Sequence, residues 1–236
     1  MEPTVTARRG PRQLSLGLTL APAMTRADFM EAPSNALALG TIEDPGGLPA
    51  GKLVLTGPAG AGKTHLLHIW AQRMGAQPVA AADLPAMLRP LLNLGQGACL
   101  VIDDADTVAA DPAGQEALFH LHNHLATQRG QMLLAARRPV RDWGLSLPDL
   151  TSRLAAATHV ALAPPDDALL AAVLVKLFND RQIRVPPSLI DYLLPRIERS
   201  LAAARDVVAR LDAAALARGR PVTRALAQEV LPGVAP

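Results

Sequence analysis

The sequence predicts an α/β protein in which a parallel sheet carries helices on both faces and a small all-α domain follows. One observation is that short apolar runs alternate with helix-length segments along most of the chain, which is typical of strands buried in a parallel sheet. The other is that this alternation ends at Pro164-Pro165, after which only helix-length segments follow. The chain has 236 residues, 50% of them hydrophobic, so it can form one sizeable α/β domain and a small second one.

The expected elements follow one another along the chain. The expected strands are the apolar runs 52–56, 98–103, 131–136 and 159–163. Helices are expected over 63–74 and 113–128, and then over about 166–180, 187–195, 199–217 and 223–231. Proline and glycine separate the last of these helices. We therefore divide the chain into a disordered leader over 1–24, an α/β domain over 25–164 and a helical domain over 165–236.

Composition argues against several classes of protein. The net charge of +2 is too small to predict a nucleic-acid partner by itself. No apolar run approaches the ~18 residues that a membrane span needs, so no membrane partner is expected. Cys99 is the single cysteine, which excludes a disulfide within the chain and makes a reducing cytoplasm the expected location. Because Cys99 lies in an apolar run, we expect it to be a small core residue.

A phosphate-binding loop is the most specific motif in the sequence. Residues 57–64 read GPAGAGKT and match G-x-x-x-x-G-K-[ST] in full, between an expected strand and an expected helix. The glycines let backbone N–H groups converge on phosphate oxygens, and the start of the helix adds favourable dipole charge. Lys63 should face the β- and γ-phosphates, and the Thr64 hydroxyl should bind Mg²⁺. The expected nucleotide contacts in this loop are Gly57, Pro58, Gly60, Gly62, Lys63, Thr64 and, one residue further, His65.

An acidic pair completes the expected site. Asp103 and Asp104 end the apolar run that begins at residue 98. We expect Asp103 to bind Mg²⁺ together with Thr64, and Asp104 to polarise the attacking water. The three histidines at 120, 122 and 124 do not form the H-E-x-x-H pattern, and we expect no metal site there.

These motifs together resemble the DnaA branch of the AAA+ family. The resemblance rests on Thr64-His65-Leu66-Leu67 and on the acidic strand that reads IDD, and it covers about residues 25–232. It implies the AAA+ parallel sheet, a helical lid, and ADP or ATP with Mg²⁺ as cofactors. Three further segments then match: Phe29–Leu39, whose Asn35 would border the adenine; 149–165, with Arg153 as arginine finger; and the sensor 2 helix, with Arg199 facing the phosphates.

The leader contains a second motif. Gln13-Leu14-Ser15-Leu16-Gly17-Leu18 resembles the short peptide that binds the bacterial sliding clamp, the β subunit of DNA polymerase III. In such peptides the glutamine hydrogen-bonds at the rim of an apolar pocket that leucines fill; here these residues are Gln13, Leu14, Leu16 and Leu18. The sequence ends after the expected lid, so we expect no helix-turn-helix and no sequence-specific DNA binding.

This arrangement implies a negative regulator of chromosomal replication initiation. Bound to the clamp, it would promote hydrolysis of DnaA-bound ATP by supplying Arg153 in trans. Ala135 and Ala136 stand where the family has Thr and Ser in sensor 1, so we expect weak or no ATP hydrolysis by the chain itself, with Arg137 as a partial substitute. The module also allows a homo-oligomer. Two alternatives are a DnaA-related helicase loader, disfavoured because only 3% of residues are aromatic, and a clamp-binding adaptor with a structural nucleotide.

Overall fold

A five-stranded parallel sheet forms the centre of the molecule. The computed structural model describes residues 24–44 and 48–231, so the expected clamp-binding peptide at 13–18 lies outside the described residues. The strands are β1 (Lys52–Thr56), β2 (Gln77–Ala80), β3 (Cys99–Asp103), β4 (Gln131–Ala136) and β5 (Thr158–Ala161). They lie in the order β2-β3-β4-β1-β5, and every neighbouring pair is parallel. All carboxyl ends therefore meet at one edge of the sheet, where α/β proteins place their sites.

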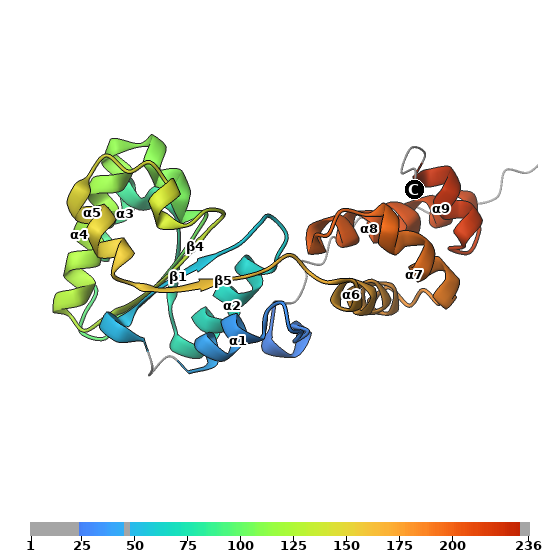
Figure 1. Ribbon diagram of the computed structural model, residues 1–236, viewed down its shortest axis with the longest axis horizontal. Helices are drawn as coiled ribbons and strands as arrows, with labels where there is room; N and C mark the ends of the chain where they lie inside the picture. The colour runs from blue at the N-terminus through green and yellow to red at the C-terminus, as the bar shows by residue number, and fades with distance from the viewer. Residues whose placement is uncertain (1–23, 45–47, 232–236) are drawn as a thin grey trace, which may run out of the picture.

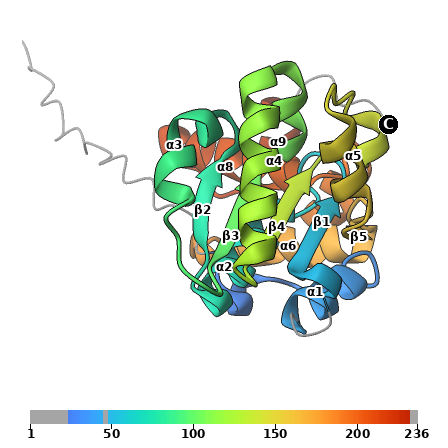
Figure 2. The same cartoon turned by 90° about the vertical axis from the view of Figure 1, so that its left-hand side faces the viewer.

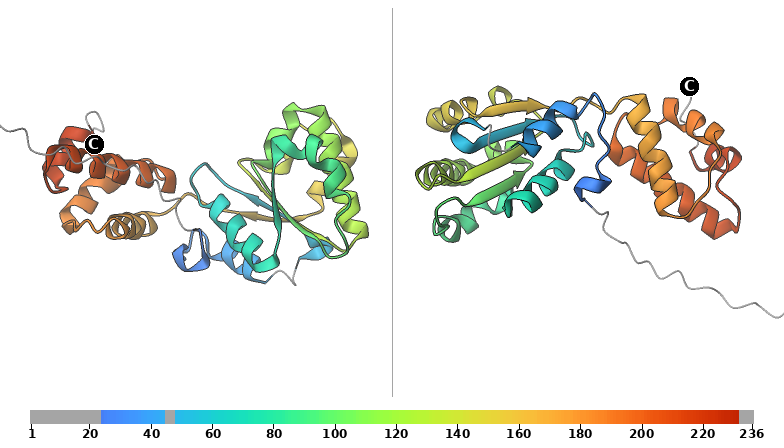
Figure 3. Two further views of the ribbon diagram at one scale, coloured as in Figure 1. Left: turned by 180° about the vertical axis from the view of Figure 1, so that it is seen from behind. Right: turned by 90° about the horizontal axis from the view of Figure 1, so that it is seen from below.

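Helices cover both faces of this sheet (Figures 2 and 3). One face carries α1 (Ala36–Glu43) and α2 (Lys63–Met74), and the other carries α3 (Leu84–Leu91), α4 (Pro112–Thr127) and α5 (Pro148–Ala155). Alternation along β1 explains the two cores: Leu53 and Leu55 pack on the α2 side, whereas Val54 packs on the α4 side. Within residues 24–44 and 48–231, short 3-10 turns join the elements at Arg26–Asp28, Pro49–Gly51, Ala81–Asp83, Ala105–Ala110, Val140–Asp142 and Leu194–Arg196.

Four helices follow the sheet: α6 (Asp167–Asp180), α7 (Pro187–Leu193), α8 (Leu201–Arg218) and α9 (Arg224–Val230). They lie together at one end of the molecule (Figure 1) and surround their own core, which includes Leu174, Phe178 and Val208. Side chains cap three of them, as the sequence favours: Asp166 accepts from Leu169 N–H at 2.7 Å, Ser200 from Ala202 N–H at 3.2 Å and Thr223 from Leu226 N–H at 3.3 Å.

The parallel α/β architecture expected from the sequence is confirmed, although not every element was predicted. β1, β4 and α2 have the expected bounds, but β2, α1, α3 and α5 were not identified as separate elements. β2 reads Gln-Pro-Val-Ala and buries only Val79, because it is an edge strand. α3 contains Pro90 and is held by packing rather than by propensity. Among the described residues, no helix is long and apolar enough to cross a membrane.

The three histidines of α4 have separate surroundings. His120 lies edge-on to Phe119, and His124 donates from Nε2 to the Leu94 carbonyl at 3.1 Å. His122 is buried, and its Nδ1 has no hydrogen-bond partner among the described residues. Within that part of the chain no cluster of three or more His, Cys, Asp or Glu could hold a metal ion. Burial, helped by the charges of Lys52 and Arg153, lowers the pKa of His122 to about 4.

This buried histidine predicts a pH-dependent stability. The unfolded chain binds a proton at His122 near the ordinary pKa of 6.5, whereas the folded chain binds it only near about 4. The free energy of unfolding should therefore be unaffected above pH 6.5 and should fall by about 3 kcal/mol as the pH drops from 6.5 to 4. Urea unfolding at several pH values measures this slope. His122→Gln should remove most of this pH dependence, and His68→Gln, at an exposed position, should not. Equal slopes in wild type and His122→Gln would show that His122 does not cause the pH dependence.

Candidate functional site

The phosphate loop, residues 57–62, is held closely by its neighbours. It leaves the end of β1 and enters α2, with the Gly57 N–H donating to the Ala136 carbonyl at 3.2 Å. A Cβ at Gly57 would lie 2.7 Å from the Leu162 carbonyl oxygen, so only glycine fits there. Gly60 has φ +70° and accepts a hydrogen bond from Leu201 N–H at 2.9 Å. The loop is therefore fixed between β4, the end of β5 and the start of α8.

The side chain of Lys63, the first residue of α2, turns back toward this loop. Its ammonium donates to the carbonyls of Gly57 at 2.7 Å and Pro58 at 2.9 Å. Burial lowers the pKa of Lys63, while the nearby carboxylates of Asp103 and Asp104 act in the opposite direction. The side chain thus brings a positive charge to the hollow of the loop, beside the start of a helix, and this arrangement attracts phosphate.

Thr64 and Asp103 bring oxygen donors together beside the loop. The Thr64 hydroxyl donates to Asp103 Oδ2 at 2.7 Å, and Asp103 Oδ1 accepts the N–H of Asp104 at 2.9 Å. Hydroxyl and carboxylate oxygens are ligands that Mg²⁺ accepts while keeping several waters. The pair predicted from the sequence is therefore adjacent, and its chemistry fits that ion.

Asp104 forms an ion pair that the sequence did not predict. It has left-handed backbone angles, φ 46° and ψ 39°, at the end of β3. The guanidinium Nε of Arg137 lies 3.5 Å from Asp104 Oδ1. Ala135 and Ala136, which precede Arg137 in β4, are fully buried and offer no side-chain donor. The first polar side chain after β4 is therefore already engaged with Asp104.

A cavity of about 310 Å³ lies beside the loop, and its lining includes Phe29, Asn35, His65, Leu169, Val173 and Leu201. Asn35 is buried and closes the turn before α1: it accepts from Ala32 N–H and donates to the Met30 carbonyl, both at 2.9 Å. His65 donates from Nε2 to the Thr25 carbonyl at 2.8 Å, and burial lowers its pKa. Both residues therefore border the cavity, and their side chains are already hydrogen-bonded within the chain.

A salt bridge joins the two sides of this cavity. Lys176 of α6 donates to Asp28, in the segment before α1, at 3.1 Å, and to Asp180 at 2.9 Å. These carboxylates raise the pKa of Lys176, and hydrogen bonds from Thr25 and Lys176 lower that of Asp28. The sequence gave no signal for this contact, because the two partners lie far apart along the chain.

Arg199 lies close to the loop but does not face it. It precedes Ser200, the N-cap of α8, and Leu201 donates directly to Gly60. Its guanidinium, however, pairs with the carboxylate of Asp167 at 3.0 Å, at the start of α6. The backbone next to Arg199 therefore lies against the loop, while its side chain is paired with Asp167.

Arg153 lies apart from the phosphate loop, the acidic pair and the cavity. It lies in the last turn of α5, a helix that the sequence did not identify as a separate element. Its exposed guanidinium lies over the Phe119 ring, 5.4 Å from the centroid. α5 packs beside α4, on the side away from the helical end (Figure 1). The structure therefore presents Arg153 outward and does not bring it to the loop of its own chain.

Comparison with known proteins identifies the class of this fold. No family model matches the chain. Chromosomal replication initiator protein DnaA of Enterococcus faecalis (strain ATCC 700802 / V583) is 28% identical over 215 residues, covering 84% of this chain and 48% of DnaA. The chain thus spans about half the length of this curated relative.

Solved structures of DnaA have a fold similar to that of this chain. Domain III of the Thermotoga maritima replication initiation protein DnaA superposes with a TM-score of 0.77 at 20% identity, covering 90% of this chain and 97% of that one. AMPPCP-bound DnaA from Aquifex aeolicus gives a TM-score of 0.67 at 21% identity, covering 82% and 66%.

The chain carries a P-loop between β1 and α2, and its fold is that of DnaA domain III. In sequence it is similar to the chromosomal replication initiator protein DnaA.

The contact between loop and α8 predicts different costs for two glycine substitutions. Gly60 and Gly75 have φ +70° and +60°, so alanine at either should cost about 1–2 kcal/mol in backbone strain. Only at Gly60 would the new Cβ also lie 1.9 Å from Ser200 Oγ, which caps α8; nothing lies within 4 Å at Gly75. Gly60→Ala should therefore lower the free energy of unfolding by about 1 kcal/mol more than Gly75→Ala, the value of a cap. Urea unfolding of both variants compares them, and equal losses would contradict the contact.

Proposed function

We propose that this chain binds ADP or ATP with Mg²⁺ between the phosphate loop and the α6–α9 helices, which act as a lid. The proposal treats 25–164 and 165–236 as two units, and their separate hydrophobic cores support that division. The phosphates would contact the N–H groups of the loop and Lys63, while Thr64 and Asp103 hold Mg²⁺. The adenine would enter the cavity beside Asn35 and His65.

Arg199 would complete this site from the lid. Its pair with Asp167 is exposed on both sides, so it contributes little to stability and can open at small cost. Phosphate oxygens would then offer the guanidinium a stronger, charge-assisted partner. The nucleotide would thereby connect the lid to the loop at a second point, beside the hydrogen bond from Leu201 to Gly60.

The nucleotide proposal predicts a thermal shift that depends on Lys63. ADP or ATP at about 100 times its Kd should stabilise the folded chain by about 2.7 kcal/mol and raise Tm. Lys63→Ala removes the ammonium that faces the phosphates and should abolish the rise. Arg73→Ala, at the other end of α2, should keep it. A full shift in the Lys63 variant would show that the loop does not bind the nucleotide.

We further propose that the chain is a regulator of the Hda type, which acts in the cytoplasm as a negative regulator of chromosomal replication initiation. It would bind the β sliding clamp of DNA polymerase III through Gln13, Leu14, Leu16 and Leu18 and promote hydrolysis of DnaA-bound ATP. The observation that carries this proposal is the outward position of Arg153 on α5. Ala135 and Ala136 support it, because their side chains offer no hydroxyl where sensor 1 of the DnaA branch has Thr and Ser.

The chemistry of Arg153 follows from the transition state of phosphoryl transfer. Negative charge spreads over the γ-phosphoryl oxygens, and a guanidinium from a neighbouring subunit stabilises it. Arg153 is available for that role because its contact with Phe119 is a cation–π interaction at an exposed position, worth about 0.5–1 kcal/mol. In a head-to-tail contact the recipient site would be that of DnaA.

This proposal predicts that Arg153→Ala removes activity in trans and nothing else. Stimulation of DnaA-bound ATP hydrolysis, measured with DNA-loaded clamp, should fall on the order of 10³-fold, while nucleotide and clamp binding persist. Arg153→Lys should also fail, since an ammonium cannot reproduce the planar fork. Arg141→Ala, at another exposed position, is the matched control and should stay active. A chain with Gln13→Ala and Leu16→Ala should lose clamp binding without a change in Tm; full stimulation by the Arg153 variants would overturn the proposal.

The alternative is a helicase-loader-type ATPase related to DnaA. The intact set of Thr64, Asp103 and Asp104 favours it, because a loader would work through its own hydrolysis cycle. The same assay separates the two functions. A loader would lose activity in Asp104→Ala and keep it in Arg153→Ala, whereas the regulator shows the opposite pattern.

A further inference from the structure

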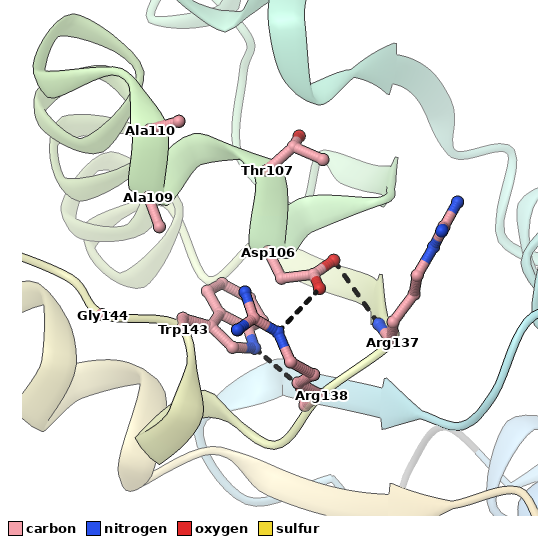
Figure 4. A pocket seen from close by; sticks show the side chains of 8 residues that line it. All are labelled: Asp106, Thr107, Ala109, Ala110, Arg137, Arg138, Trp143 and Gly144. Carbon is pink, nitrogen blue, oxygen red and sulfur yellow. Dashed lines mark hydrogen bonds and ion pairs between the residues drawn. The ribbon is translucent and has the colours of Figure 1, made fainter.

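Two hollows of the structure contain arginine side chains, and these differ in their partners. In a hollow of about 630 Å³ that Trp143 also lines, Arg138 turns its guanidinium toward the buried carboxylate of Asp106, with Nε at 3.8 Å (Figure 4). Arg205 of α8 lines the other hollow, the cavity of about 310 Å³ beside the phosphate loop, and is half-buried there. Within residues 24–44 and 48–231, the Arg205 guanidinium forms neither a hydrogen bond nor an ion pair.

The start of α8 determines where Arg205 lies relative to the phosphate loop. Leu201, the first residue of α8, donates its N–H to the Gly60 carbonyl at 2.9 Å. Arg205 follows four residues later on the same face of the helix, and both side chains line the cavity. Four residues of helix place its Cα about 6 Å further along α8. Arg205 is therefore directed at the part of the cavity beyond the contact between α8 and the loop.

The carboxylates that line this cavity already have a cation. Asp28 and Asp180 accept hydrogen bonds from Lys176 at 3.1 Å and 2.9 Å. Burial is the main cause of the lowered pKa of His65, and the positive charge of Arg205 acts in the same direction. The described wall of the cavity thus leaves the charge of Arg205 without a carboxylate of its own.

The remaining wall of the cavity is mostly apolar. Its apolar side chains are Phe29, Met30, Leu169, Val173, Leu177 and Leu201. An apolar wall with a few polar groups that fix orientation is typical of sites for small ring-bearing ligands. A guanidinium presents five N–H donors in a planar fork, so it needs acceptor atoms on the ligand. A purine with its ribose offers such acceptors on ring nitrogens and hydroxyl oxygens.

We propose that Arg205 is the residue of the lid that binds the nucleoside half of the nucleotide, the adenine with its ribose. The inference rests on the proposed nucleotide binding and adds to it a contact beyond the phosphates. With the phosphates at the loop and Lys63, the nucleoside occupies the cavity, and the Arg205 guanidinium donates hydrogen bonds to it. A half-buried charged donor without a partner in the chain gains more from such a bond than an exposed one.

This contact gives the two lid arginines different tasks. Arg199 precedes α8 and is paired with Asp167, and the phosphates would be its ligand. Arg205 lies within α8 and faces the cavity. A substitution at Arg205 should therefore affect recognition of the nucleoside, whichever number of phosphates the nucleotide carries.

The test is the affinity of the full chain for ADP with Mg²⁺, measured by isothermal titration calorimetry. Arg205→Gln should raise Kd about 10-fold, as expected for the loss of one hydrogen bond from a charged donor. Arg210→Gln is the matched control, because Arg210 lies on the same helix outside the cavity and pairs with Asp206; its Kd should be unchanged. Without nucleotide, Arg205→Gln should have a Tm equal to or above that of wild type, since its side chain loses no partner.

Two comparisons distinguish a contact with the nucleoside from attraction to the phosphates. The ratio of Kd in Arg205→Gln to Kd in wild type should be the same for ADP and for ATP. It should also be the same at about 0.05 M and about 0.5 M NaCl, because salt weakens the attraction between separated charges far more than a direct hydrogen bond to a neutral group.

Several results would overturn the inference: an unchanged Kd in Arg205→Gln, an equal loss in Arg210→Gln, or a loss that is confined to ATP or disappears at high salt. A lower Tm of the nucleotide-free Arg205 variant would also overturn it, by showing that the side chain supports the fold. No binding of ADP by wild type means that the proposed nucleotide binding fails. Binding by wild type with the same Kd in Arg205→Gln means that only the role of Arg205 fails.

Discussion

The rest of the structure depends on the backbone contacts that hold the phosphate loop. Gly57 donates to β4 and lies against the Leu162 carbonyl, and Gly60 accepts from the first residue of α8. A loop whose N–H groups are to converge on an anion has to be fixed before the anion arrives, since a mobile loop would lose that entropy on binding. Three segments far apart in the chain supply that fixation. The same contacts bring the sheet and the helical end together at the loop.

The local chemistry of the loop was predictable from the sequence, and its long-range partners were not. GPAGAGKT after an apolar strand specifies a strand, a loop and a helix start, and β1 and α2 have the predicted bounds. The adjacency of Thr64 and Asp103 also follows from the pattern, because parallel strands end at one edge. The pairs Arg137–Asp104 and Arg199–Asp167 depend on side-chain direction, which neither spacing nor propensity determines.

The elements that the sequence did not predict were overlooked for a common reason. β2 and α3 contain prolines, which disfavour the interior of a strand or a helix, so their own sequences favour neither element. Both are formed because β3 and α4 offer a surface on which they pack. α5, which carries Arg153, is only eight residues long and follows an irregular segment, so the sequence did not separate it from its surroundings. Tertiary packing therefore determined what local preference left open.

The proposed function is a separation of two tasks. One site would retain a nucleotide, while Arg153 on another surface would act on DnaA. The central claim is that the loop, the end of β3 and the start of α8 form a single nucleotide site. Hydrogen exchange with and without ADP and Mg²⁺ tests it most directly. The account predicts slower exchange in 57–66, 103–104 and 199–205 together; protection of the loop with no change at the start of α8 would contradict it.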